Sequence, residues 1–257
     1  MGARVTEGDL RVASSLDRAV AGAEVVVQIL TFPTFPVEKP RKRYTFEEFD
    51  HLGTQRLVQA AVRAGAGKFV YGSGSGAAPD AAKVWFRAKW GGEEAIRAAG
   101  IDHAIIRPSW VYGPEDRALN RFVAFHRWLP FVPVVGDGRQ RLQPVFVDDA
   151  AAAFARAASP QGPQGTFEIG GPHVLTMNEV LATMMAVRGK RKPLVHFPVA
   201  LPKLAGFFLQ FLPGAPLSPD AVEFVTGDAL ADIGPLLAKF DLTLTPLGEG
   251  LATYLGS

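Results

Sequence analysis

Residues 101–116 read IDHAIIRPSWVYGPED, and this stretch decides the fold class. The run at 103–107 is short, apolar and rich in β-forming residues, which is typical of a buried parallel strand. Pro108 cannot donate to a sheet ladder, so the strand is expected to end there. In open α/β sheets, ligands bind beyond the carboxyl ends of strands, so residues 107–112 are expected to line a site. An ordinary exit from strand to loop is the alternative.

Segments on both sides of this stretch alternate between expected strands and helices. Strands are expected at residues 4–6, 25–30, 68–71 and 166–169, and helices at residues 14–20, 44–63, 81–99 and 176–187. This alternation predicts an α/β fold with a doubly wound parallel sheet. The length of 257 residues suits one large domain with a smaller lobe, so we expect a division into residues 1–160 and 161–257.

Composition excludes several classes of function. The chain has 27 Lys and Arg against 25 Asp and Glu, a near balance that does not argue for nucleic-acid binding. It has no cysteine, which excludes disulfides, thiolate catalysis and zinc–thiolate sites. The five histidines lack ligand spacing, so no metal site is expected. No signal peptide or spanning helix is visible. The absence of cysteine fits a cytoplasmic protein, with a membrane-peripheral location as an alternative.

RPSWVYGPED at 107–116 resembles the Arg-Pro-x-x-Val-Tyr-Gly-Pro signature of extended and atypical short-chain dehydrogenases/reductases. Other motifs fit the family in the same order: EGDL at 7–10, Gly53-Thr54, FVYGS at 69–73, Lys89 with Glu93, and QPVFVDD at 143–149. Three more resemble the branch that includes the nucleotide-binding accessory subunit of respiratory complex I and its bacterial relatives: FEIGGP at 167–172, LSPD at 217–220 and LTPLG at 244–248. The resemblance implies a Rossmann-like, NAD(P)-binding fold of the NAD-dependent epimerase/dehydratase kind.

One part of the family pattern has no counterpart in this sequence. The strand that residues 4–6 resemble is the family's third, and the first strand, its glycine-rich turn, the helix and the second strand are missing. The pyrophosphate of a dinucleotide normally rests on that helix. Residues 25–30 would then have an unpaired apolar edge. Three explanations stay open: an upstream segment outside this N-terminally truncated sequence, a strand at residues 4–6 in the vacant place, or cover by another chain.

The resemblance also implies a catalytic centre of a Tyr-x-x-x-Lys pair with a serine. Lys89 and Ser73 match the lysine and the serine, but Trp85 occupies the tyrosine position. Residues four apart share a helix face, so an ammonium there would lower the pKa of a phenol. An indole N–H only donates and cannot replace the phenol. Ser73 and Lys89 are therefore catalytic candidates, and Trp85 is not expected to be competent.

By the same resemblance, the residues that contact NAD or NADP would lie at strand ends and in the loops that follow. The candidates are Asp9, Leu10, Gln28, Ile29, Leu30, Ser73, Lys89, Arg107, Pro108, Ser109, Trp110 and Val111. Because the pyrophosphate site has no counterpart, both retained and lost cofactor binding stay open.

The sequence thus favours an atypical NAD(P)-binding protein of this family with weak or absent redox activity and an accessory or binding role. One alternative is an active NAD(P)-dependent oxidoreductase or nucleotide-sugar epimerase/dehydratase. A second is a partner-docking subunit that binds no nucleotide. The apolar segment at 195–212 is expected to pack on the main domain, or else to hold an apolar substrate, a protein partner or a membrane surface.

Overall fold

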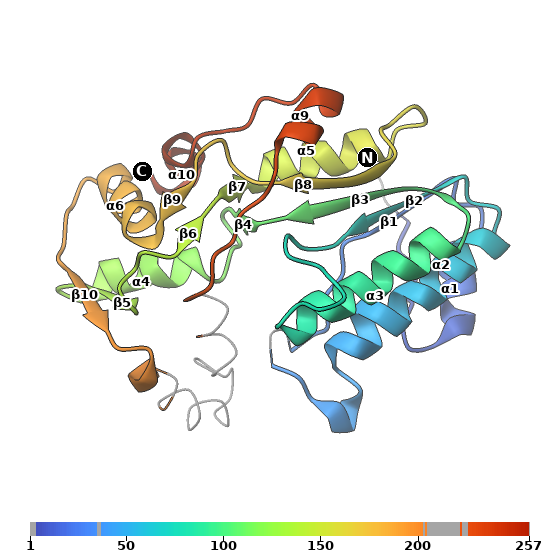
Figure 1. Cartoon of the computed structure of the whole chain (residues 1–257), viewed down its shortest axis with the longest axis horizontal. Coiled ribbons are helices and arrows are strands. Elements are labelled where there is room, and N and C mark those ends of the chain that lie inside the picture. Colours follow the sequence, from blue (N-terminus) through green and yellow to red (C-terminus); the bar gives the residue numbers. More distant parts are fainter. Residues whose placement is uncertain (1–3, 35–36, 203, 205–221, 223–225, 257) are drawn as a thin grey trace. The chain divides into compact units, whose positions relative to one another are not determined.

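The computed structural model describes residues 4–34, 37–202, 204, 222 and 226–256 (Figure 1). The chain forms two compact units. Unit 1 comprises Met1–Pro108, Ala151–Ile169 and Asp232–Leu242, and unit 2 comprises Ser109–Ala150, Gly170–Ala231 and Thr243–Ser257. The expected division at residue 160 follows the chain, whereas each of these units draws on three separate stretches. The assignment of the C-terminal part to a substrate or partner stays a prediction.

Unit 1 is built on a four-stranded sheet in the order β1-β2-β3-β8, with every neighbouring pair parallel. The strands are β1 (Val25–Gln28), β2 (Lys68–Gly72), β3 (Asp102–Pro108) and β8 (Gly165–Ile169). In register, Val26 lies opposite Phe69, and Ile106 lies opposite Phe167. The expected parallel α/β sheet is confirmed, and β3 ends at Pro108 as the sequence indicates.

Helices cover both faces of this sheet, as Figure 1 shows for α1, α2 and α3 on one face and α9 on the other. The helical segments of unit 1 are α1 (Ala13–Ala19), η1 (Pro40–Lys42), η2 (Glu47–Gly53), α2 (Thr54–Arg63), α3 (Val84–Ala98), α9 (Gly234–Phe240) and most of α5 (Val147–Ala157). The helix expected at 44–63 is a π-helix, η2, that continues directly into α2. The core on the α1–α3 side includes the buried side chains of Val58, Phe69, Ile96 and Ile105.

The strand expected at residues 4–6 is wrong. These residues have no regular structure, and the side chain of Val5 is 90% exposed. So short a strand would gain few ladder bonds and bury one apolar side chain, which does not offset the entropy of ordering it. Among the described residues β1 pairs only with β2, so residues 4–6 do not occupy the vacant place beside β1.

Among the residues of unit 2 that the structure describes, there are three two-stranded sheets, with helices beside them. The strand pairs are β4 (Trp110–Tyr112) with β7 (Pro144–Phe146), β5 (Val132–Val135) with β10 (Leu194–Phe197), and β6 (Arg141–Leu142) with β9 (Leu175–Thr176). The helices are α4 (Leu119–Trp128), α6 (Met177–Val187) and α10 (Leu247–Leu255). Thr176 and Glu179 form a capping box at the start of α6, since each bonds the other's backbone N–H.

The apolar segment at 195–212 lies only partly within the described residues. Its first part forms β10, and residues 203 and 205–212 lie outside them. Within the described ranges, no helix combines the length and the apolar character needed to cross a bilayer.

Candidate functional site

Lys89 lies on α3 and forms an ion pair with a buried carboxylate. Its Nζ is 2.7 Å from Oδ1 of Asp50, on η2, and donates to the backbone oxygen of Gly72 at 3.0 Å. Asp50 is 3% exposed, so the pair is largely removed from water. An ion pair in such a place attracts strongly because solvent screens it little. The lysine that would serve a reacting phenol is therefore bound by a carboxylate of the same chain.

Tyr71 is a phenol that lies beside Lys89 in space, although no sequence spacing links the two. The Lys89 ammonium is 5.2 Å from the centre of its ring, and its hydroxyl donates to the backbone oxygen of Asp50 at 3.2 Å. Tyr71 is fully buried, and burial raises its pKa to about 12. A general acid or base is most effective with a pKa near the working pH. Tyr71 therefore does not replace the missing catalytic tyrosine.

The same surroundings shift the pKa values of both Asp50 and Lys89. Burial alone would lower the pKa of Lys89, but Tyr71 and the Asp50 carboxylate raise it above its ordinary range. Burial raises the pKa of Asp50, and the ammonium opposes that rise. The Lys89 ammonium is thus held in its protonated form beside Asp50 and the buried Tyr71.

Trp85 lies one helical turn before Lys89 and packs among other aromatic rings. Its ring centre is 5.9 Å from that of Phe46 and 5.8 Å from that of Phe86. Phe46 in turn meets the buried ring of Phe32 edge to face at 4.9 Å. Because an indole does not ionise in the useful pH range, this position supplies an aromatic wall and no proton carrier.

Ser73 follows β2 directly and donates its hydroxyl proton to a second buried carboxylate. Its Oγ lies 2.6 Å from Oε1 of Glu93, which is fully buried. Arg107 donates to both oxygens of Glu93, at 2.8 and 2.6 Å, and Arg97 adds a bond of 2.7 Å. These bonds to Glu93 raise the pKa of Arg107. Ser73 and Arg107 therefore belong to one charge-assisted network.

Backbone bonds bring several of the candidates together at one end of the sheet. The N–H of Ser73 donates to the oxygen of Ile106 at 2.8 Å, and that of Ser75 donates to the oxygen of Pro108 at 2.9 Å. Lys89 reaches the same place through Gly72. The structure thus places Ser73, Lys89, Arg107 and Pro108 at the carboxyl ends of β2 and β3.

The candidates at the end of β1 differ in where their side chains lie. Gln28 is buried and donates to Oγ1 of Thr54 at 2.8 Å, while its Oε1 has no hydrogen-bond partner among the described residues. Ile29 and Leu30 are exposed. A Cβ at Gly72 would lie only 2.9 Å from Cγ2 of Ile29, so glycine lets the Ile29 side chain lie over the end of β2.

The candidates before α1 are already held by neighbours. Arg11 donates to both carboxylate oxygens of Asp9, with Nε at 2.9 and 3.1 Å, and lies 4.9 Å from the ring centre of Tyr44. The bonds from Arg11 lower the pKa of Asp9 to about 2. Leu10 is buried, and its backbone oxygen accepts from Arg56 at 3.2 Å.

The last three candidates lie in unit 2. Ser109 donates its hydroxyl proton to the backbone oxygen of Gln143. Trp110 is buried in the core of this unit, and Val111 pairs with Val145 between β4 and β7. In the same unit, Thr245 donates from its N–H and its hydroxyl to Asp149, at 2.7 and 2.9 Å, which joins the QPVFVDD and LTPLG motifs.

Sequence reasoning missed the roles of Asp50, Tyr71 and the charge network of Glu93. Asp50 precedes Lys89 by 39 residues, and only the packing of η2 against α3 brings them together. The close approach of η2 to α3 is possible because Gly92 has no side chain: a Cβ on it would lie 2.3 Å from the backbone oxygen of Asp50. Within the described residues no group of three or more His, Asp or Glu could hold a metal ion.

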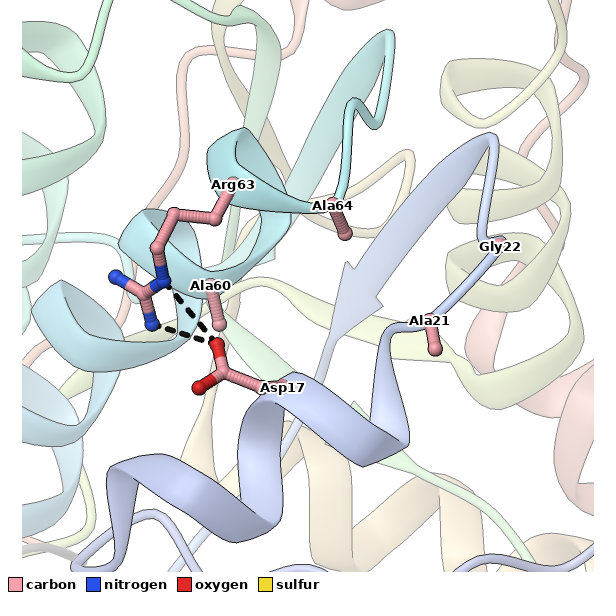
Figure 2. Close-up of a pocket in the computed structure, with 6 residues that line it drawn as sticks. All are labelled: Asp17, Ala21, Gly22, Ala60, Arg63 and Ala64. Carbon is pink, nitrogen blue, oxygen red and sulfur yellow. Dashed lines mark hydrogen bonds and ion pairs between the residues drawn. The ribbon is translucent and has the colours of Figure 1, made fainter.

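A surface hollow of about 500 Å³ lies between α1 and α2, at the other end of the strands (Figure 2). It is lined by small residues and by the exposed ion pair of Asp17 and Arg63, at 2.7 Å. Its walls include Gly22, in the turn before β1, and Ala64, before β2. None of the candidate site residues lines it.

The fold and the site together define a Rossmann-like protein of the short-chain dehydrogenase/reductase type. Residues 2–170 match the family described as the NAD dependent epimerase/dehydratase family, and the chain belongs to this family. The resemblance stated from the sequence motifs is therefore confirmed.

Named relatives include both a respiratory-chain subunit and a reductase. The chain is 31% identical over 251 residues to NADH dehydrogenase [ubiquinone] 1 alpha subcomplex subunit 9, mitochondrial, of Arabidopsis thaliana, covering 93% of this chain and 61% of the relative. It is 32% identical over 155 residues to the ceramide reductase of Caulobacter vibrioides, covering 59% of this chain and 47% of that protein. The chain thus spans about three fifths of the length of the first relative.

Solved structures confirm the fold. UDP-glucuronic acid 4-epimerase from Bacillus cereus, in complex with NAD, superposes with a TM-score of 0.71 at 18% identity, covering 92% of this chain and 74% of that chain.

Proposed function

We propose that this chain is an atypical, NAD(P)-binding-type member of its family with weak or absent redox activity, which acts as an accessory or binding protein. One observation carries the proposal: the position of the catalytic phenol holds Trp85, and the lysine that would activate a phenol is paired with Asp50 at 2.7 Å. Restoring a proton relay would require both a phenol and a released ammonium.

The residues present do not complete a dinucleotide site. The polar side chains of Asp9, Ser73 and Lys89 bond Arg11, Glu93 and Asp50, respectively. The described part of the chain has no glycine-rich turn before a helix N-terminus that could hold a pyrophosphate. Contact with NAD or NADP would fall to residues at the nicotinamide end, such as Lys89 and Arg107, and we expect it to be weak in this chain.

The relative of Arabidopsis thaliana is named as a subunit, which supports a protein partner for this chain. For its location we propose the cytoplasm, with a membrane-peripheral place as the alternative. A second candidate function is reduction of an apolar substrate, which the similarity to a ceramide reductase favours. The two candidates differ in whether the purified protein oxidises NADH or NADPH.

The test compares the wild-type chain with Trp85→Tyr, Lys89→Met and the double variant Trp85→Tyr/Asp50→Asn. NADH and NADPH binding is followed by nucleotide fluorescence, and turnover with an oxidised ceramide is followed by the loss of the reduced-nicotinamide absorption band. We expect turnover by the wild-type protein to be no greater than that of Lys89→Met. Trp85→Tyr alone should stay inactive because Asp50 still holds Lys89. Turnover by the wild type that Lys89→Met abolishes would refute the accessory role and support the reductase.

A further inference from the structure

Unit 2 presents a surface that combines an exposed indole with a concentration of positive charge. Trp128, the last residue of α4, is 76% exposed, and it is the one strongly exposed aromatic residue among those that the structure describes. The guanidinium of Arg127 lies 5.1 Å from its ring centre. The indole is thus largely open to solvent and has a cation beside its ring.

The exposed face of α4 leads to this indole. Arg121, Ala124 and Trp128 are all exposed, and their spacing places them on one side of the helix, while the exposed Arg117 lies in the turn before it. The opposite side carries the buried residues Leu119, Phe122 and His126. The helix is therefore amphipathic, and its solvent face carries cations and ends in a large aromatic ring.

The loop after α6 adds more cations beside the end of α4. The buried His126 bonds the backbone oxygen of Lys190 through Nε2 at 2.6 Å and accepts from Arg188 at Nδ1 at 3.1 Å. Lys192 donates to the backbone oxygens of His126 and Leu129, each at 2.6 Å, which satisfies the end of the helix. These contacts fix residues 188–192 against α4, while Lys190 and Arg191 stay exposed.

The charge of this region differs from that of the rest of the chain. Residues 117–136 and 180–199 hold seven Lys and Arg and no Asp or Glu, which leaves 20 Lys and Arg against 25 Asp and Glu elsewhere. A chain with a net charge of only +2 thus gathers its excess cations in one region. We call Arg127, Trp128, Lys190 and Arg191 the Trp128 patch.

We propose that the Trp128 patch docks unit 2 on a membrane surface that contains anionic phospholipid. Tryptophan favours the interface between water and hydrocarbon, where its ring is buried and its N–H stays hydrated. Clustered Lys and Arg side chains are attracted to the negative potential of anionic headgroups, and their aliphatic stems lie along the apolar boundary. A single exposed ring does not make the series of stacking platforms that single-stranded nucleic acid uses. The proposal needs no nucleotide and does not depend on the residues around Lys89, which belong to unit 1.

The test is cosedimentation of the full chain with vesicles of phosphatidylcholine and phosphatidylserine, and with vesicles of phosphatidylcholine alone. We expect binding only to the anionic vesicles, weakened at high salt. Lys190→Glu/Arg191→Glu should weaken binding by at least about tenfold, since each cation near the surface contributes roughly fivefold in affinity. Trp128→Ala should weaken it by about fivefold or more. The wild-type emission should shift to the blue on binding, and this shift should be lost in Trp128→Phe.

The matched control is Arg4→Glu/Arg18→Glu, which changes the net charge equally on exposed residues of unit 1. This variant should bind nearly as well as the wild type. An equal loss in the control would show that binding follows net charge and would overturn the proposal. Binding to heparin without binding to anionic vesicles would assign the patch to a soluble polyanion, which also overturns it.

Discussion

Asp50 and Glu93 are both buried carboxylates whose partners reach the end of β2, yet they are paired in different ways. Asp50 has one cationic partner, Lys89, which also bonds Gly72. Glu93 has two, Arg97 and Arg107, and in addition accepts from Ser73. Two separate charge networks thus hold the neighbouring residues Gly72 and Ser73 at the end of β2.

The two networks differ in their expected consequence for catalysis. Glu93 is saturated by donors whose guanidinium geometry suits a carboxylate, so this network stabilises the strand end. Asp50 instead binds the ammonium of Lys89, which matches the lysine that the family uses beside its reacting phenol. The first network explains order at the site, and the second explains why the site is not expected to react.

The largest expected effect is that of Glu93→Ala. This change leaves the mostly buried guanidinium of Arg107 with only the longer contact to Glu168, at 3.9 Å, and loss of one partner of a buried pair destabilises a protein by about 3–5 kcal/mol. The free energy of unfolding in urea measures it. Glu94→Ala is the matched control, because Glu94 is exposed and pairs only with Arg97, so a change of less than about 1 kcal/mol is expected. Equal effects of the two changes would contradict the distinction.

A double-mutant cycle on Asp50 and Lys89 should give the next largest effect. Asp50→Leu alone leaves the ammonium unpaired in a poorly solvated place and should destabilise the fold by about 3 kcal/mol. Combining it with Lys89→Met removes both charges, so most of that loss should be regained. Additive losses in the double variant would show that the two side chains do not interact as a pair.

Ser73→Ala should have a smaller effect. The change removes one donor to Glu93 but leaves both arginines in place, so unfolding should become easier by about 1.5 kcal/mol, the value of a bond to a charged group. Urea unfolding measures the change. A loss as large as that of Glu93→Ala would mean that Ser73 holds the whole network.

The smallest effect should come from an exposed pair, Asp9 with Arg11. Arg11 lowers the pKa of Asp9 from 3.8 to about 2, so the pair contributes fully above pH 3.8 and its contribution is lost as the pH falls through about 2. Because Asp9 is 35% exposed, solvent screening limits this contribution to less than about 1 kcal/mol. The wild-type protein should lose slightly more stability than Asp9→Asn over that pH range, as measured by urea unfolding. An identical pH dependence of both proteins would exclude the effect.

The sequence determined the class of fold, because short apolar runs such as 103–107 must be buried and Pro108 must end a ladder. It also determined that position 85 lacks a phenol, since this depends on residue identity alone. Spacing on one helix placed Trp85 near Lys89 without any knowledge of tertiary contacts.

Only the tertiary structure decided what Lys89 and Ser73 bond. Their partners Asp50 and Glu93 come from η2 and from a later turn of α3, and the packing of these helices against β2 sets the distances. The absence of a strand at residues 4–6 was also a tertiary outcome, because a strand forms only where a partner strand and a buried face stabilise it. Local pattern specifies which backbone conformations are favoured, whereas pairing between distant charges depends on contacts that the pattern does not contain.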